Sequence, residues 1–340
     1  MKYDNLVFIG RFQPFHLGHR IVIDKALEIS EHVTIVLGSH DSAQSTRNPF
    51  TTQQRIEMIS EAYSEDQNKR IRFVPQVDHT YNFDRWIAGV QSGVASAESS
   101  HGWKSGGTKT GIIGYEKDES SFYLKAFPMW ERVDFGYISK IDATSIRKTL
   151  FEEHFTKLWG VPDNVFMFLR EFMKTPIHQK LVDEWSFIQK YKTQWADAPY
   201  PPTFVTADAV VVQSGHILLV ERGAAPGEGL LALPGGFVNQ FEEIDDAVFR
   251  ELREETRIAV PEAVLRGSVT IKKVFDGPWR SERGRTITHA YLIKLNDMNP
   301  LPKIKGSDDA KKAMWIPFSD LRRDNMFEDH AEIIANLTGV

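Results

Sequence analysis

Three glutamates stand close together in the segment RELREE, residues 250–255. Glu251, Glu254 and Glu255 are spaced i, i+3 and i+4, so a helix would project all three carboxylates from one face. Like charges at this spacing repel each other unless a cation compensates them, and carboxylate oxygens select Mg²⁺ or Mn²⁺. A solvated acidic helix face is the alternative interpretation. The spacing predicts a divalent-cation site at these three glutamates.

A second candidate site lies in GRFQPFHLGH, residues 10–19. His16 and His19 are three residues apart, a spacing that suits a metal, the surface or a packed core. The pair follows the apolar run 6–10, and ligands of a parallel sheet bind where its strands end. Gly18 allows a close approach of backbone to ligand, and the start of a following helix favours phosphate. No third metal ligand is evident nearby, so the sequence favours phosphate binding over zinc.

Strand and helix signals alternate in the first part of the chain. The predicted strands cover 6–10, 32–39, 70–77 and 110–117, and the predicted helices cover 19–30 and 51–63, the latter capped by Thr51 or Thr52. The polar Gly/Ser stretch at 96–110 predicts a loop. This alternation indicates an α/β fold with a doubly wound parallel sheet, whose ligand crevice lies at the carboxyl ends of the strands.

The pattern changes near residue 200. The segment from 144 to about 192 is predicted to be helical, and the PYPP at 199–202 cannot continue a helix. Short strands follow, with a hairpin at 208–222 around Ser214-Gly215 and a strand at 286–295. We therefore expect three parts in the chain: a first domain with a helical extension at 1–192, a linker at 193–202 and a second domain at 203–340.

The segment GRFQPFHLGH resembles the H-x-G-H signature of the nucleotidylyltransferase superfamily, and its longer form resembles the archaeal-type nicotinamide mononucleotide (NMN) adenylyltransferases. GSHDSAQSTRNPFTTQQR at 38–55 and DATSIRKTL at 142–150 resemble further elements of that family. The resemblance covers roughly 1–150. It implies a Rossmann-like domain that transfers an adenylyl group from ATP to NMN, giving NAD and pyrophosphate.

The same resemblance implies a set of site residues. The ATP contacts would be Gly10, Arg11, Gln13, His16, His19, Arg47, Thr144, Ser145 and Arg147, with His16, His19 and Arg147 as the catalytic ones. Asn82 and Trp86 are the candidates for NMN, because a tryptophan ring attracts the nicotinamide cation. A tryptophan packed in a helix core is the alternative.

The segment GFVNQFEEIDDAVFRELREETRI, residues 236–258, resembles the Nudix box G-x5-E-x7-R-E-U-x-E-E-x-G-U, in which U is aliphatic. The matching residues are Gly236, Glu242, Arg250, Glu251, Glu254 and Glu255. The resemblance implies an α/β/α sandwich that hydrolyses a nucleoside diphosphate derivative, with Mg²⁺ or Mn²⁺ on the three glutamates, Glu254 and Glu255 catalytic, and Glu242 paired with Arg250. Arg257 stands where the box has its second glycine, so we expect the chain to leave the helix differently there.

Two flanking segments, at 275–293 and 306–321, resemble ADP-ribose pyrophosphatases. They place Arg280, Arg283 and Arg285 as candidate ADP-ribose contacts and Asp308 or Asp309 as a residue that positions water. A solvated basic loop is the alternative for the arginines. The resemblance implies hydrolysis of ADP-ribose to AMP and ribose 5-phosphate.

The order of the two halves resembles bacterial bifunctional proteins that join these two activities. Two other functions stay open. The first half could transfer a nucleotidyl group to phosphopantetheine or glycerol phosphate, although the GRFQPF prefix disfavours this. The Nudix half could be a non-catalytic ligand sensor, although no basic helix–turn–helix candidate follows it and its glutamates are intact.

The composition is that of an ordinary globular protein. Hydrophobic residues make up 41% of the 340, charged residues 26%, and the net charge is −5, which argues against a nucleic-acid-coating role. There is no cysteine and no apolar run of about 18 residues. We expect a cytoplasmic protein whose partners are ATP, NMN, NAD and ADP-ribose, without nucleic acid or membrane. The sequence is compatible with a homo-oligomer.

Overall fold

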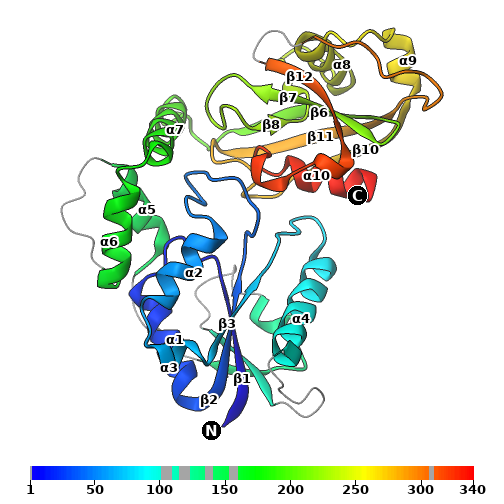
Figure 1. The fold of residues 1–340 in the computed structure, drawn as a ribbon. Coiled ribbons are helices and arrows are strands. Elements are labelled where there is room, and N and C mark those ends of the chain that lie inside the picture. Colours follow the sequence, from blue (N-terminus) through cyan, green and yellow to red (C-terminus); the bar gives the residue numbers. More distant parts are fainter. Residues whose placement is uncertain (1, 101–108, 115–122, 135–140, 153–159, 306–309) are drawn as a thin grey trace. The chain divides into compact units, whose positions relative to one another are not determined.

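The computed structural model describes residues 2–100, 109–114, 123–134, 141–152, 160–305 and 310–340. The chain forms two compact units, Met1–Val182 and Asp183–Val340, which we describe separately (Figure 1). The division lies within helix α7 (Pro176–Thr193). The linker expected at 193–202 stays a prediction.

The first unit contains a five-stranded parallel sheet in the order β3-β2-β1-β4-β5. Its strands are β1 (Tyr3–Gly10), β2 (Ser30–Leu37), β3 (Ile71–Pro75), β4 (Thr110–Gly114) and β5 (Glu131–Asp134). Its helices are α1 (Leu17–Ile29), α2 (Thr52–Ser60), α3 (Glu65–Asn68), α4 (Phe83–Ser100), α5 (Ala143–Phe151) and α6 (Asp163–Phe172), followed by α7.

The predicted doubly wound sheet is confirmed, with α1 and α4 on opposite faces (Figure 1). Val7 and Ile9 of β1 form a buried cluster with Val90 and Val94 of α4. Gly10 pairs with Leu37, so the carboxyl ends of β1 and β2 meet at one edge of the sheet. Two expectations were incomplete: β5 was not predicted, and the loop predicted at 96–110 is helical up to residue 100 because α4 continues there.

The second unit contains a seven-stranded mixed sheet with the central order β10-β11-β6-β7-β12, β8 pairing with β7 and β9 with β6. Its strands are β6 (Thr203–Gln213), β7 (His216–Arg222), β8 (Leu231–Ala232), β9 (Gly235–Phe237), β10 (Val269–Phe275), β11 (Arg285–Lys294) and β12 (Ala310–Pro317). Its helices are α8 (Ile244–Thr256), α9 (Glu262–Gly267) and α10 (His330–Thr338), with short 3-10 turns η2 (Phe318–Asp320) and η3 (Arg323–Asn325).

This unit is the predicted α/β/α sandwich, since α8 and α10 lie on opposite sides of the sheet (Figure 1). Alternate residues of β6, Ala207, Ala209 and Val211, form one buried cluster with Val248 and Leu252 of α8. The predicted hairpin is confirmed. Ser214 and Gly215, which join β6 to β7, have φ angles of 49° and 72°, as a tight hairpin turn requires.

Within the part of the chain that the structure describes, no helix is long and apolar enough to cross a membrane.

Candidate active sites

The turn after β1 positions the two histidines at the start of α1. His16 is the N-cap residue of α1: its Nδ1 accepts a hydrogen bond from the backbone N–H of His19 at 3.3 Å. The Nδ1 atom of His19 accepts in return from the backbone N–H of His16, also at 3.3 Å. The rings stack with centroids 3.6 Å apart. Each histidine therefore fixes the orientation of the other.

This reciprocal capping determines which ring nitrogen carries the proton. A neutral imidazole has one donor and one acceptor nitrogen. Since Nδ1 accepts from a backbone N–H in both His16 and His19, Nε2 is the protonated nitrogen in both. An Nε2–H group donates to an anion and does not ligate zinc, so the capping favours phosphate contacts, as the sequence indicated.

The distant DATSIR segment reaches this turn through Arg147. The Arg147 side chain is buried on α5, and its Nη1 donates to the backbone carbonyl of Gln13 at 2.8 Å. Its Nη2 lies 3.3 Å from Oγ1 of Thr144. The first and last motifs of this unit, more than a hundred residues apart in the chain, thus form one site.

Gln13 and Ser145 have partners that suggest positioning roles rather than the expected ATP contacts. The buried amide of Gln13 donates to the Phe50 carbonyl (2.9 Å) and accepts from the Phe50 N–H (3.0 Å). The N–H and hydroxyl of Ser145 both donate to the carboxylate of Asp142, the N-cap of α5. An acid at this helix start competes with phosphate for the same donors.

The other predicted ATP contacts surround the same edge of the sheet. Gly10 ends β1, and Nη1 of Arg11 lies 3.4 Å from Oδ1 of Asn48. Arg47 precedes Asn48 in the segment between β2 and α2, and its side chain is half-buried. Thr144 is exposed at the start of α5.

The two NMN candidates begin helix α4. Oδ1 of Asn82 accepts from the N–H of Arg85 at 3.0 Å and so caps the helix. The ring of Trp86 stacks on Phe83 with centroids 5.7 Å apart and packs partly buried against the core. This packing fits the alternative of a core tryptophan, and the NMN contact stays a proposal.

In the second unit, α8 carries the Nudix-box carboxylates as predicted. Arg250 lies at the centre of a group of three glutamates. Its Nε and Nη2 donate to Glu242 (2.6 and 2.9 Å), so the expected Glu242–Arg250 pair is present. Its Nη1 donates to both Glu251 and Glu254 at 2.8 Å. A Cβ on Gly236 would lie 2.5 Å from Oε1 of Glu251, so any other residue at this position would displace that carboxylate.

Two further carboxylates, those of the buried Asp208 and the half-buried Glu255, lie beside this group. Oε2 of Glu255 accepts from the N–H of Gly235 at 3.0 Å, and burial raises the pKa of Glu255 to about 8. Asp208, which pairs with Gly235 across β6 and β9, was not predicted as a site residue; burial raises its pKa to about 6. Burial also raises the pKa of Glu251. Each of these carboxyl groups would be stabilised in its charged form by a cation.

The carboxylate oxygens of Glu251, Glu254 and Glu255 are suitable ligands for a divalent cation, although they do not converge on one position. In the described residues, no three acidic or histidine side chains converge as a preassembled metal site. Instead Arg250 neutralises Glu251 and Glu254, while Glu255 faces Gly235. Metal binding at the three predicted glutamates would require their carboxylates to turn away from these partners.

The three predicted ADP-ribose arginines differ in their surroundings. Arg280 is buried in a bidentate ion pair with Asp329 (3.0 and 2.8 Å). Arg285 donates to the backbone carbonyl of Asp276 and lies 3.7 Å from the carboxylate of the same residue. The roles of both arginines as ADP-ribose contacts stay predictions. Arg283 is half-buried, 3.8 Å from Glu328. Asp308 and Asp309 lie outside the described residues.

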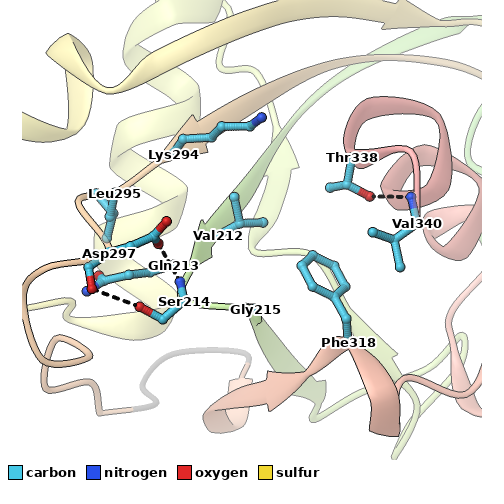
Figure 2. A pocket seen from close by; sticks show the side chains of 10 residues that line it. All are labelled: Val212, Gln213, Ser214, Gly215, Lys294, Leu295, Asp297, Phe318, Thr338 and Val340. Carbon is cyan, nitrogen blue, oxygen red and sulfur yellow. Dashed lines mark hydrogen bonds between the residues drawn. The ribbon is translucent and has the colours of Figure 1, made fainter.

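A cavity of about 210 Å³ lies beyond the end of β6 (Figure 2). Its wall includes the hairpin residues Val212–Gly215, Lys294 and Phe318, and Asp297 holds the N–H of Ser214 at 2.6 Å. None of the Nudix-box residues lines it. The box is therefore a separate site.

Comparison with known proteins agrees with both motifs. Residues 7–149 match the cytidylyltransferase-like family and residues 202–337 match the NUDIX domain family. The nicotinamide/nicotinic acid mononucleotide adenylyltransferase of Acinetobacter baylyi is 36% identical over 194 residues, 57% of this chain and 96% of that protein. The ADP-ribose pyrophosphatase of Methanocaldococcus jannaschii is 32% identical over 130 residues, 38% of this chain and 70% of that protein.

Solved structures match both units together, and one of them carries ligands. That structure is of a bifunctional NMN adenylyltransferase/ADP-ribose pyrophosphatase from Francisella tularensis, complexed with AMP and a Mn ion. It is 36% identical, covers 99% of both chains and has a TM-score of 0.92. The chain belongs to this bifunctional NMN adenylyltransferase/ADP-ribose pyrophosphatase family.

Another buried residue that sequence reasoning missed is Arg55. Among the described residues it is the largest fully buried side chain, and its Nη1 donates to the carbonyls of Arg11 (2.8 Å) and Gly38 (2.6 Å). Its Nη2 lies 3.2 Å from the carbonyl of Ser39. Burial lowers the pKa of Arg55 to about 10. Arg55 thereby joins the turn after β1, which leads into the two predicted histidines, to the end of β2.

Arg257 stands in place of the second box glycine, and the expectation that the chain leaves the helix differently there was wrong. Arg257 adopts φ 43° and ψ 39°, the left-handed conformation that glycine adopts readily, and its N–H bonds to the carbonyl of Arg253 at 2.9 Å. The chain therefore leaves α8 as a glycine would allow, with an arginine in a strained conformation.

Arg257→Gly is expected to increase the free energy of unfolding of the Nudix unit by about 1 kcal/mol, since a side chain in this conformation costs that much. Thermal unfolding would measure the change. Arg253→Gly, one turn earlier on the same helix, is the matched control and should lower stability by about 1 kcal/mol. Equal destabilisation by both substitutions would show that the conformation of Arg257 is not strained.

The raised pKa of the half-buried Glu255 predicts that the stability of the metal-free protein depends on pH. Its pKa is about 8 in the folded state against 4.5 as the ordinary value, so the folded state holds an extra proton between these values. With EDTA present, the contribution of Glu255 to the free energy of unfolding should be complete below about pH 4.5 and should be lost as the pH rises through about 8. In thermal unfolding with EDTA, Glu255→Gln should remove this loss. A loss of equal size in the variant would assign it to another group.

Proposed function

We propose that this chain catalyses two reactions of NAD metabolism, one in each unit. The first unit transfers the adenylyl group of ATP to NMN and gives NAD and pyrophosphate. The second hydrolyses ADP-ribose to AMP and ribose 5-phosphate. The observation that carries the proposal is the match over 99% of both chains to the Francisella tularensis protein, together with both motifs assembled in their own units.

In the first unit, the 5′-phosphate oxygen of NMN attacks the α-phosphorus of ATP, and the bond from that phosphorus to the bridging oxygen of pyrophosphate breaks. Charge neutralisation and positioning dominate such a transfer. His16 and His19 donate from Nε2–H to the ATP phosphates, because their Nδ1 atoms are engaged in capping α1. Arg11, Arg47 and Arg147 add charge at the same edge of the sheet, and Gln13 and Arg55 hold the turn in place.

In the Nudix unit, Glu251, Glu254 and Glu255 would hold the divalent cation, Mg²⁺ or Mn²⁺. When bound, such a cation polarises the diphosphate and lowers the pKa of a water molecule. Arg250 neutralises Glu251 and Glu254 in its absence and holds Glu242, which keeps the loop before α8 in place. Gly236 allows its strand to approach Glu251 closely, and the N–H of Gly235 donates to Glu255.

A panel of acceptors tests the first reaction. The chain is incubated with ATP, Mg²⁺ and, in separate reactions, NMN, nicotinic acid mononucleotide, phosphopantetheine and glycerol phosphate, and pyrophosphate release is measured. The proposal predicts release with NMN and none with phosphopantetheine or glycerol phosphate. Release with either of the latter, and none with NMN, would assign the unit to another acceptor.

A further inference from the structure

The loop of the first unit that carries Arg47 is closed on itself. The N–H of Ser45 donates to the carbonyl of Asn48 at 3.2 Å, and the N–H of Asn48 donates to Oγ of Ser45 at 3.1 Å. Nε2 of Gln44 donates to the carbonyl of Pro49 at 2.7 Å. Arg47 therefore stands within a compact loop, and its position depends on how the end of that loop is held.

Phe50 ends this loop and is buried. Its N–H and its carbonyl both bond to the amide of Gln13. Its ring meets the rings of Phe172 and Phe168 on α6 edge-on, at centroid distances of 4.9 and 5.8 Å and interplanar angles of 65° and 74°. Aromatic pairs with this geometry attract each other beyond the apolar area that they bury. The loop is thus held from two sides, by the turn after β1 and by α6.

Phe168 and Phe172, which we call the α6 ring pair, are presented together by the helix. They are four residues apart and so project from one face of α6, and their rings are nearly parallel, at 12°, with centroids 6.5 Å apart. One turn earlier, Nδ2 of Asn164 donates to the carbonyl of Met58 at 2.9 Å and joins α6 to α2. Helix α6 therefore contacts both the end of the loop and the helix that follows it.

The ring pair also contacts the part of this unit that carries Arg147. The Phe172 ring meets the ring of His178, on α7, at 5.7 Å and 83°. Nε2 of His178 lies 3.0 Å from the carbonyl of Leu150 on α5, the helix that carries Arg147. Aromatic contacts thus connect the loop of Arg47 to the helix of Arg147, although more than a hundred residues separate these segments in the chain.

We propose that the α6 ring pair positions ATP indirectly, by fixing the place of Arg47 relative to Arg147 so that both guanidinium groups meet the triphosphate. The inference rests on the proposed adenylyl transfer and adds two positioning residues to that site. Guanidinium groups bind phosphate through directed hydrogen bonds, so a displacement of about 1 Å weakens the contact strongly. The nicotinamide nucleotide does not depend on this distance in the same way.

Phe168→Ala tests the proposal, because Phe168 is half-buried and its loss leaves the buried Phe172 in place. In NAD synthesis we expect the KM for ATP to rise roughly tenfold, the scale of weakening a hydrogen bond to a charged group, and the KM for NMN to change less than about twofold. The dissociation constant of ATP with Mg²⁺ and without NMN, measured by calorimetry, should rise by the same factor. Phe168→Tyr restores the ring and should recover the affinity.

Met167→Ala is the matched control, since Met167 neighbours Phe168 on the same helix but is 52% exposed, and it should match the unsubstituted chain. Unchanged ATP affinity in a folded Phe168→Ala variant, or equal increases in the KM for ATP and for NMN, would overturn the proposal. If Phe168→Ala does not fold, Phe168→Leu, which keeps an apolar side chain without the ring, carries the same expectation. If the unsubstituted chain binds ATP but forms no NAD, the proposed function fails, and the ATP dissociation constants still decide the positioning role.

Discussion

Replacing His19 with alanine is expected to lower the rate of NAD synthesis by roughly 10²-fold or more, the scale of losing a donor that stabilises a transition state. The substitution removes two things at once. The Nε2–H donor to the ATP phosphates is lost, and the N–H of His16 loses the Nδ1 atom that accepts from it at 3.3 Å. The His16 ring also loses its stacked neighbour.

Initial rates with ATP and NMN measure this effect, and ADP-ribose hydrolysis by the same sample should be unchanged. His32→Ala is the matched control, since His32 lies near the amino end of β2 in the same unit, away from the carboxyl ends of the strands. An unimpaired rate of NAD synthesis in His19→Ala would rule out the phosphate-donor role. Loss of both activities in a folded variant would contradict the assignment of one reaction to each unit.

Glu254→Gln should have the converse effect, lowering ADP-ribose hydrolysis by at least roughly 10²-fold and sparing NAD synthesis. Glutamine has nearly the same shape and can still accept from Nη1 of Arg250, which lies 2.8 Å from Oε2 of Glu254. The change therefore removes a charge that a divalent cation needs while leaving the contacts of α8 in place. The Glu254 side chain is 47% exposed, so little folding energy depends on it.

Rates at several Mn²⁺ concentrations separate weak metal binding from lost chemistry. Glu262→Gln serves as the control, since Glu262 lies outside the box segment and pairs with Arg253 and Arg266. Hydrolysis within tenfold of the unsubstituted rate at saturating Mn²⁺ would show that Glu254 is not required.

Much of the fold follows from local patterns in the sequence. Apolar runs such as LVFIG predict buried strands, and the hairpin at Ser214-Gly215 follows from residues that tolerate positive φ. The carboxylates of α8 could be predicted because helical spacing alone brings them to one face. Strand β5 was missed because its sequence, ERVD, is short and three of its four residues are charged.

The residues that sequence reasoning missed or misplaced depend on contacts between distant segments. Arg55 reads as a polar residue of an amphipathic helix, yet it is fully buried because it bonds the carbonyls that end two strands. Arg280 and Arg283 stand in one basic loop, and only the structure shows that Arg280 pairs with Asp329 at 2.8 Å whereas Arg283 lies 3.8 Å from Glu328. No spacing rule predicts such pairs.

The central claim, two reactions carried by one chain, is tested most directly by chromatography of the products that the unsubstituted chain forms with Mg²⁺. One incubation contains ATP and NMN, and the other contains ADP-ribose. The account predicts NAD and pyrophosphate in the first, and AMP and ribose 5-phosphate in the second. Absence of NAD from the first, or intact ADP-ribose in the second, would contradict it.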